Sequence, residues 1–345
     1  MIRGYFGNML DKIVIKNFGP LTNFSWNKLG KINLVIGDNS CGKTFLLKAL
    51  YSAMRTLEEY KRGKEQRTAS EILVEKLYWT FQPDKIGDLV TKGAEKLLSF
   101  HITFSGSDFQ YEFGKDTSKQ ISSLENHVPP RESNSIFLPA KEVLSLHSII
   151  LKSREQDKSF GFDDTYLDLA RALRQSPRRG QNYKEFSQAR TALEAIFGGK
   201  VELDEVAGLW YFKKGNQKFS IELTAEGIKK IAILDTLLGN RYLSNDSIVF
   251  IDEPEAALHP TVISKLLDII VILAECGVQF FLSSHSYFVV KKLFLLAQQK
   301  NMSIPLISSH GTQWTTMDLK DGMPDNPIID ESIRLYEEEV ELVLQ

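Results

Sequence analysis

The sequence predicts an α/β fold with a mixed sheet core, an antiparallel β-subdomain and a helical insertion lobe. The sheet is predicted from residues 247–299, where continuous apolar strands alternate with helices, a pattern typical of parallel strands covered on both faces. A second indication is the apolar strand at 32–36, which runs through a glycine-rich loop into a helix. A three-strand meander at 200–223 adds antiparallel strands, with turn residues at 205–208 and 215–216.

The N-terminal elements are three short β-rich runs followed by one helix. The runs lie at 13–15, 24–26 and 32–36, and turn residues separate them. The helix is predicted over 45–54, because its apolar side chains recur at helical spacing: Phe45, Leu46, Ala49, Leu50 and Met54.

The middle of the chain is mainly polar and predicts helices interrupted by two strand-like pieces. One piece is a hairpin over 98–113 that turns near 106–108, and the other is a strand at 135–138. We therefore predict three units: a core formed by 10–56 and 200–328, an inserted helical lobe with short strands at 57–199, and a C-terminal helix at 329–345.

The C-terminal half returns to a regular alternation of helices and strands. Proline near the start of one helix and Gly277 just past its end mark its limits at 260–275. The other predicted elements are a loop and helix at 224–238, strands at 247–251 and 278–283, a helix at 287–299 and an acidic helix at 329–344.

Composition excludes several classes of protein. Among the 345 residues, no apolar run approaches the ~20 residues that cross a bilayer, and the first ten residues lack the apolar core of a secretory signal. The two cysteines, Cys41 and Cys276, imply no disulfide framework. We therefore expect a cytoplasmic protein without a membrane partner, and the formal net charge of -2 gives no overall sign of nucleic-acid binding.

A phosphate-binding loop is predicted between the strand at 32–36 and the following helix. Its glycines let the backbone curl so that amide hydrogens point at phosphate oxygens, Lys43 neutralises the β and γ phosphates, and the Thr44 hydroxyl ligates Mg²⁺. A chance glycine turn is the alternative, which the strand-loop-helix setting disfavours. The predicted nucleotide-binding residues are Gly37, Asp38, Asn39, Ser40, Cys41, Gly42, Lys43 and Thr44.

Two further strand ends carry polar residues that suit the same site. Asp252 and Glu253 follow an apolar strand, so we expect Asp252 to hold Mg²⁺ and Glu253 to act as the general base for water. His285 follows the next strand and is predicted to sense the γ-phosphate, because ligands of open α/β sheets bind beyond the carboxyl ends of the strands. A helix-starting turn at 252–254 and a purely structural His285 are the alternatives.

Together these residues resemble the ABC-type ATPase heads, and within them the OLD-like and RecF-like group often labelled AAA-15 or AAA-21. The resemblance covers residues 10–56 and 220–330 and implies an ATPase that uses ATP and Mg²⁺. It also implies a signature loop just before the strand at 247–251, formed by Thr224, Ala225, Glu226 and Gly227. In that family the loop caps the nucleotide of a second copy, so the resemblance implies a homodimer with ATP sandwiched between protomers. The run 258–260, Leu-His-Pro, is typical of the OLD-like group and argues against a transporter subunit.

The resemblance leaves two functional alternatives. Because about 60 residues follow His285, too few for the Toprim nuclease of OLD enzymes, a nuclease or toxin would act in trans, as in anti-phage systems of the Septu and PARIS types. The alternative is a DNA-stimulated ATPase of the recombination and repair type, similar to RecF and SMC. A solvated helical hairpin competes with DNA binding for the basic cluster Arg171, Arg174, Arg178, Arg179 and Lys184, and Lys61, Arg62, Lys64 and Arg67 form a weaker one.

The predicted C-terminal helix has one apolar face. Ile333, Tyr336, Val340 and Val343 recur at helical spacing, so the face is expected to pack on the protein's own head rather than to dock a partner.

Overall fold

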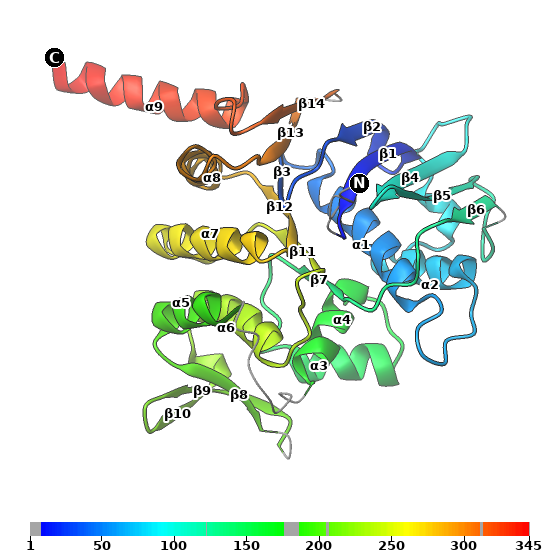
Figure 1. Cartoon of the computed structure of the whole chain (residues 1–345), viewed down its shortest axis with the longest axis horizontal. Helices are drawn as coiled ribbons and strands as arrows, with labels where there is room; N and C mark the ends of the chain where they lie inside the picture. Colours follow the sequence, from blue (N-terminus) through cyan, green and yellow to red (C-terminus); the bar gives the residue numbers. More distant parts are fainter. Residues whose placement is uncertain (1–7, 122, 176–185, 205–206, 311–312, 345) are drawn as a thin grey trace, which may run out of the picture.

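A central sheet separates two layers of the protein. The structure is a computed structural model that describes residues 8–121, 123–175, 186–204, 207–310 and 313–344. Figure 1 shows helices on one side of the central sheet and a second, antiparallel sheet with its own helices on the other side. Among the described residues, no helix combines the length and the apolar character that a membrane span requires.

The central sheet has six strands in the order β14-β13-β3-β12-β11-β7. All neighbours are parallel except β13 and β14, which form an antiparallel pair at one edge. The carboxyl ends of β3, β12 and β11 therefore meet at one edge of the sheet. The strands are β3 (Ile32–Gly37), β7 (Ser135–Leu138), β11 (Ile248–Asp252), β12 (Gln279–Ser284), β13 (Pro305–His310) and β14 (Gln313–Asp318).

The strands β3, β7, β11 and β12 are buried on both faces, as the continuous hydrophobic runs predict. Leu34 and Leu282 point into a core shared with the helices α5 to α8. Val35 and Phe281 point into a second core, which the helix α1 and the antiparallel sheet complete. These four strands are therefore buried on both sides, so their polar groups reach solvent mainly at the strand ends.

The helices lie where the hydrophobic periodicity places them, and several carry clear end signals. Thr68 and Glu71 form a capping box at the start of α2, and Pro260 occupies the first turn of α7. The helices are α1 (Lys43–Glu59), α2 (Ala69–Phe81), α3 (His147–Leu151), α4 (Asp164–Leu173), α5 (Ser187–Phe197), α6 (Glu226–Gly239), α7 (Pro260–Glu275), α8 (Tyr287–Lys300) and α9 (Pro327–Leu344). Short 3₁₀ helices (η) lie at Ile86–Leu89 and Ile221–Leu223, and a short π-helical segment lies at Lys152–Gln156.

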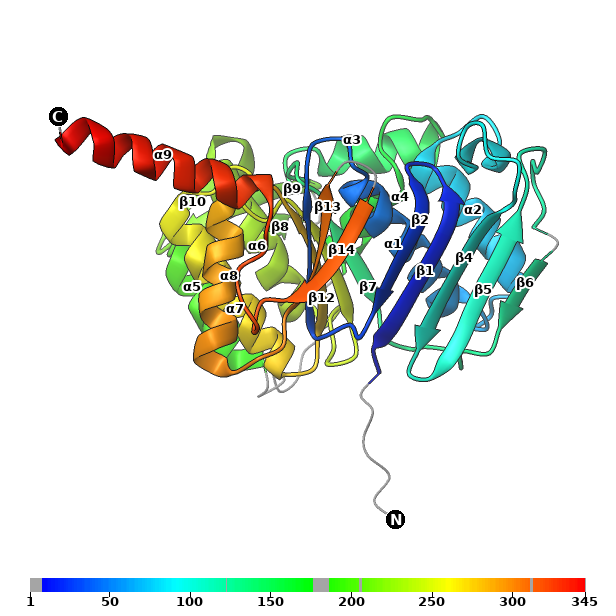
Figure 2. The same cartoon turned by 90° about the horizontal axis from the view of Figure 1, so that it is seen from above.

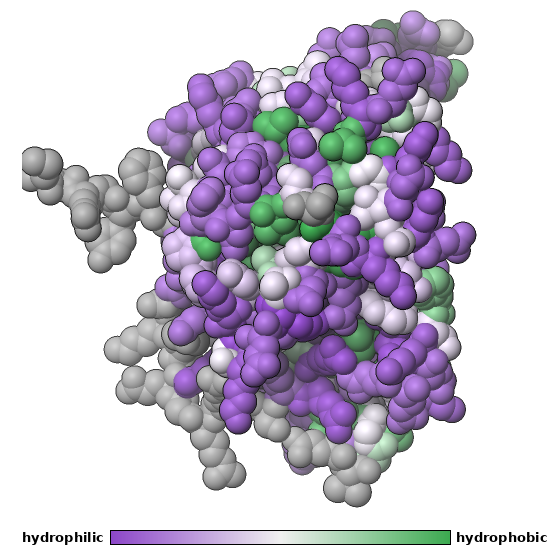
Figure 3. All heavy atoms as spheres, turned by 90° about the vertical axis from the view of Figure 1, so that its right-hand side faces the viewer, coloured by the Kyte–Doolittle hydropathy of each residue, from purple (hydrophilic) through white to green (hydrophobic). Residues whose placement is uncertain are grey.

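The second sheet has five antiparallel strands in the order β2-β1-β4-β5-β6. Its inner face is aromatic, with Phe100, Phe109 and Tyr111 fully buried. Figure 3 shows the molecule from the side of this sheet, where the surface is mostly hydrophilic with small apolar patches. The strands are β1 (Leu10–Phe18), β2 (Leu21–Asn27), β4 (Leu98–Phe104), β5 (Ser107–Phe113) and β6 (Ser123–Asn126).

This sheet corrects the predicted insertion at 57–199. The hairpin β4–β5 extends the N-terminal hairpin through β1, and β7 forms the edge of the central sheet beside β11. The strands of 57–199 are therefore part of the core, and helices α2 to α4 pack around them instead of forming a lobe with strands of its own. The physical reason is that β1 and β11 each have a second edge, whose backbone groups stay unpaired until β4 and β7 are added to it.

The meander predicted at 200–223 is confirmed, except that its last three residues turn into the η segment Ile221–Leu223. Its strands are β8 (Lys200–Asp204), β9 (Leu209–Lys214) and β10 (Gln217–Ser220), in the order β10-β9-β8. Trp210 and Phe212 anchor this small sheet in the core; Trp210 packs edge-on against His147 of α3, and β8 lies against α6.

The structure contradicts the expected packing of the C-terminal helix. Of the residues of α9, only Ile329 is buried, and Ile333, Tyr336, Val340 and Val343 are exposed. Figures 1 and 2 both show α9 extending away from the body beyond α8. The apolar face is therefore present as predicted, but the protein's own head does not cover it.

Candidate active site

The loop between β3 and α1 adopts a backbone that depends on glycine. Gly37 has φ +146° and Gly42 has φ +102°, both in the region that other residues rarely adopt. A Cβ at Gly37 would lie 2.8 Å from the Cβ of Ser309, and one at Gly42 would lie 2.9 Å from the Cγ of Pro20. The two glycines therefore allow a tight turn that is closed in by β13 and by the β1–β2 turn.

The loop ends at the positively polarised start of α1. Gly42 is the N-cap of α1, and the free amide groups of the first turn point toward the loop, as at the start of any helix. The first turn contains no acidic residue that would compete for them. Lys43 is largely buried, and its Nζ donates to the carbonyl oxygens of Gly37 and Asp38 at 2.8 Å each. The ammonium group is thereby held over the loop, where a phosphate group would be bound.

Thr44 and Asp252 meet at this point although 208 residues separate them. The Thr44 hydroxyl lies 3.0 Å and 2.9 Å from the two carboxylate oxygens of Asp252. Ser283, at the end of β12, also donates to Asp252. These hydroxyl and carboxylate oxygens suit Mg²⁺, which proteins bind through one or two such groups together with substrate phosphates. Among the described residues, no cluster of three or more His, Cys, Asp or Glu could hold a metal by itself.

Glu253 and His285 form the next layer of the site. The Nδ1 of His285 lies 3.4 Å from the Oε1 of Glu253, and both side chains are partly exposed. The backbone of Glu253 has φ +50°, and its N–H donates to the carbonyl of Ser283 at 3.0 Å. The strained turn directs the Glu253 carboxylate away from the strand and toward His285.

Glu255 fixes the backbone around His285. Its Oε1 accepts hydrogen bonds from the Ser284 hydroxyl at 2.7 Å and from the His285 backbone N–H at 3.3 Å. The same oxygen lies 3.9 Å from the His285 Nδ1. The turn after β12 is thus fixed to the turn after β11.

The signature residues 224–227 lie at the start of α6. A Cβ at Gly227 would lie 2.8 Å from the Leu258 side chain and 3.1 Å from the carbonyl of Ala257, so the first turn of α6 packs closely on the segment after Glu253. Within the described residues, no hydrogen bond or ion pair joins 224–227 to the loop at 37–44. The structure therefore gathers the loop, Asp252, Glu253 and His285 in one place, and the signature residues adjoin the segment after Glu253 without bonding to the loop.

Residues 32–291 match the sequence profile described as "AAA domain, putative AbiEii toxin, Type IV TA system", named AAA_21. The chain belongs to the AAA_21 family. No protein of curated function matches it.

Solved structures show that this AAA_21 chain has the fold of Smc head domains, which confirms the predicted α/β class with a mixed sheet core. An Smc head bound to the C-winged helix domain of ScpA aligns with a TM-score of 0.53 and 14% identity, over 90% of this chain and 97% of that one. An Smc head with an extended coiled coil, bound to the C-terminal domain of ScpA and derived from Pyrococcus furiosus, gives 0.51 and 12%, over 95% and 98%. At these identities the likeness concerns the fold alone.

One residue of the AAA_21 site was not predicted from the sequence. Lys230, in the first turns of α6, is 7% exposed, and its Nζ donates to the backbone carbonyl of Glu253 at 2.5 Å. Burial lowers the pKa of Lys230 to about 8, although Glu255, Asp252 and Glu253 act to raise it. A lysine in an amphipathic helix usually lies on the solvated face, so the sequence carried no signal for this contact.

A second unpredicted group approaches the site from α4. Lys48, one turn after Thr44, forms an ion pair of 2.6 Å with Asp163, which caps α4. Burial raises the pKa of Tyr166 to about 12, and the charges of Asp163 and Asp252 act in the same direction. The ion pair therefore ties the start of α4 to α1, one turn after Thr44.

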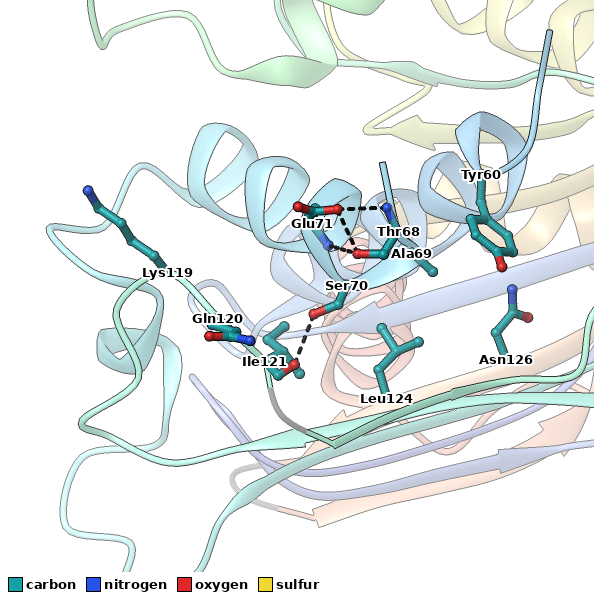
Figure 4. Close-up of a pocket in the computed structure, with 10 residues that line it drawn as sticks. All are labelled: Tyr60, Thr68, Ala69, Ser70, Glu71, Lys119, Gln120, Ile121, Leu124 and Asn126. Atoms are coloured by element: carbon teal, nitrogen blue, oxygen red, sulfur yellow. Dashed lines mark hydrogen bonds between the residues drawn. The ribbon is translucent and has the colours of Figure 1, made fainter. Parts of the chain in front are cut away.

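A separate hollow beside α2 lacks the features of a catalytic site. This cavity has a volume of about 800 Å³. Figure 4 shows the residues that line it, between the start of α2 and the strand β6. Its acid, Glu71, accepts from the Thr68 backbone N–H at 2.8 Å and so serves the capping box. The lining residues are Tyr60, Thr68, Ala69, Ser70, Glu71, Lys119, Gln120, Ile121, Leu124 and Asn126.

Proposed function

We propose that this AAA_21 protein binds ATP with Mg²⁺ at residues 37–44 and hydrolyses it. The observation that carries the proposal is the pairing of the Thr44 hydroxyl with the Asp252 carboxylate at 2.9 Å. That contact brings a phosphate-type loop and an acidic strand end together, as a magnesium nucleotide requires. Both predicted catalytic side chains, Glu253 and His285, lie next to it.

The donor set assigns a task to each group. The loop amides and Lys43 would hold the phosphates, and Thr44 and Asp252 would hold Mg²⁺, which neutralises negative charge on the phosphate oxygens when it is bound. Glu253 would orient a water molecule and accept its proton at the carboxylate. His285, 3.4 Å from Glu253, would orient that carboxylate and contact the γ-phosphate.

We further propose that a second copy completes the site. Ala225 and Glu226 are exposed, and Thr224 and Gly227 are partly exposed. Within the described residues, no hydrogen bond or ion pair joins 224–227 to the loop of their own chain, which supports a role toward the nucleotide of another copy. The amides at the start of α6, including that of Gly227, would serve as anion donors there. Two ATP molecules would then lie between two protomers.

For the biological role, we propose a nucleotide-dependent scaffold that holds or releases an effector protein, a nuclease or a toxin in trans, in bacterial anti-phage defence. The description of the family as AbiEii-type and as part of a type IV TA system supports a toxin-linked role. The further placement with OLD-like heads of the Septu and PARIS types is part of this proposal.

The test of ATP binding and turnover uses two variants and one control. Lys43→Ala should abolish binding of a fluorescent ATP analogue, because the phosphates lose their main cation. Glu253→Gln should bind the analogue normally but release phosphate at least about 100-fold more slowly, since the general base is lost. Glu112→Gln, an exposed change on β5, is the control and should match the wild type.

Two results would count against this assignment. Unchanged binding by Lys43→Ala would show that 37–44 is not the nucleotide site. Wild-type turnover by Glu253→Gln would remove that residue from the reaction and leave binding alone.

The described basic residues leave the DNA-stimulated alternative open as a second candidate. Arg171 pairs with Glu155 at 2.8 Å and Arg67 with Glu65 at 2.6 Å. The other described members of the two clusters are exposed and form no ion pair within the described residues: Lys61, Arg62, Lys64 and Arg174. Arg178, Arg179 and Lys184 lie outside the described residues. A salt-dependent rise in phosphate release on adding duplex DNA would replace the effector proposal with the DNA-linked one.

A further inference from the structure

The C-terminal helix α9 carries an apolar stripe that the described residues leave largely uncovered. Its members alternate at spacings of four and three residues, which is the repeat of a coiled-coil seam. We call the five residues Ile329, Ile333, Tyr336, Val340 and Val343 the α9 seam. Ile329 is 8% exposed, whereas Ile333 is 50%, Tyr336 67% and Val343 80% exposed. Such a stripe on a surface helix normally faces another element.

The base of α9 is firmly attached to the body. Asn326 is buried, and its Nδ2 donates to the Ser308 hydroxyl at 2.7 Å. The Oδ1 of Asn326 accepts the backbone N–H of Ile328 at 2.9 Å and so caps the helix. From Ile333 onward, every described side chain of α9 is exposed, and Figure 2 shows the helix projecting beyond α8. The seam is therefore presented to solvent from a fixed base.

Acidic residues border the seam on both sides. Asp330, Glu337 and Glu339 occupy positions next to it, and α9 contains six acids and one base. The base, Arg334, bonds to Glu331 at 2.6 Å and to Glu338. Within the described part of the chain, Glu337 and Glu339 form no ion pair. An apolar seam thus lies between unneutralised carboxylates.

We propose that the α9 seam docks an amphipathic helix of a different protein, one whose apolar stripe is flanked by Lys and Arg. Charge complementarity selects this occupant, because side chains beside a seam set the choice of partner. A second copy would bring only carboxylates and no base to the flanks of the seam. Anionic lipid would also be repelled, since helices that lie on membranes are rich in Lys and Arg on the polar face.

The proposal is tested with the full-length chain and two synthetic probe peptides, without nucleotide. Both peptides are three-heptad helices with Ile and Leu on the apolar stripe, and the flanking positions are all Lys in one and all Glu in the other. By fluorescence anisotropy, the wild type should bind the Lys peptide about tenfold or more tightly than the Glu peptide, because several flanking pairs act together.

Variants of α9 give the decisive comparison. Glu337→Lys combined with Glu339→Lys should reverse the preference between the two peptides. Tyr336→Asp should remove binding of both, whereas Leu335→Asp, an exposed residue of the same helix outside the seam, should leave binding unchanged. Thermal unfolding verifies that each variant is folded, and none of these residues touches the proposed ATP site.

Three outcomes would overturn the proposal: binding of neither peptide by the wild type, equal affinity for both, or self-association that Tyr336→Asp abolishes. Because the assay contains no nucleotide, any of these results would leave the proposed ATPase function untouched. Loss of ATP binding would in turn leave the peptide result untouched.

Discussion

Lys230 shows how one side chain can connect two parts of a site. It lies in the first turns of α6, directly after the signature residues, and holds the backbone carbonyl of Glu253 at 2.5 Å. Glu253 is thus fixed at its N–H by Ser283 and at its carbonyl by Lys230. Any movement of α6 would be transmitted to the position of the proposed general base.

Lys230→Met should therefore lower the kcat for ATP hydrolysis by about 10- to 100-fold, the cost of a misplaced catalytic group. The KM for ATP should change little, since Lys230 does not touch the loop at 37–44. Steady-state phosphate release measures both constants.

The neighbouring residue provides a matched control. Lys229 is also buried, but its Nζ donates to the Ser145 hydroxyl at 2.8 Å and lies 3.5 Å from Glu142. Lys229→Met should leave kcat closer to the wild type, and Lys230→Arg should restore part of the lost turnover. An equal loss of kcat in both Met variants would mean that burial of the lysines, and not the contact with Glu253, matters.

At the scale of elements, a buried charge network joins α1, α2 and α4. Lys76 of α2 lies 2.9 Å from Glu59, 3.4 Å from Asp164 and 3.5 Å from Asp168. Tyr51 of α1 donates to Asp168 at 2.8 Å. Burial acts to raise the pKa of Asp168, but Lys76 and Arg55 outweigh it and lower the pKa to about 2.

Lys76→Met should reduce the free energy of unfolding at pH 7 by roughly 3–5 kcal/mol, because Asp164 and Asp168 lose a buried partner. The folded pKa of Asp168 lies below its usual value, so its stabilising contribution is present above about pH 4 and is lost as the pH falls toward 2. In the variant both acids can protonate at higher pH, so the deficit should shrink between pH 7 and pH 4.5. Urea unfolding at the two pH values measures this change, and a deficit that does not depend on pH would contradict it.

The elements differ in how far sequence could predict them. Helices such as α7 and the central strands β3, β7, β11 and β12 can be predicted because their patterns are local, with Pro260 and Gly277 marking the limits of one helix. The pairing of β4 with β1 and of β7 with β11 cannot be predicted in this way. It joins segments about a hundred residues apart and depends on which strand edges remain unpaired. The pair β13–β14 was missed as well.

The same distinction holds for the candidate site. The loop, Asp252, Glu253 and His285 follow strands with strong patterns, and the parallel order of those strands brings them together. The contacts of Lys230 with Glu253 and of Lys48 with Asp163 arise from how α6 and α4 pack, which no spacing in the sequence encodes. For α9, sequence predicted the apolar face but not whether the head would cover it.

For the whole molecule, the separation of residues 224–227 from their own phosphate loop predicts a change of assembly with nucleotide. Glu253→Gln with ATP and Mg²⁺ should sediment at about twice the monomer mass of 39.2 kDa, because bound ATP is not consumed. Lys43→Ala under the same conditions should remain a monomer. Analytical ultracentrifugation distinguishes the two, and a Glu253→Gln protein that stays monomeric while ATP is bound would refute the shared site.

The backbone of Glu253, with φ +50°, implies a compromise between the stability of the fold and the rate of ATP hydrolysis. A side chain at such a position costs about 1–2 kcal/mol, which glycine would avoid. Two replacements that both delete the carboxylate can expose that cost: Glu253→Gly should unfold at a higher temperature than Glu253→Ala, the reverse of the usual order for these residues. In that case glycine at 253 would give the more stable protein, and the cost of the glutamate is explained by its role in hydrolysis.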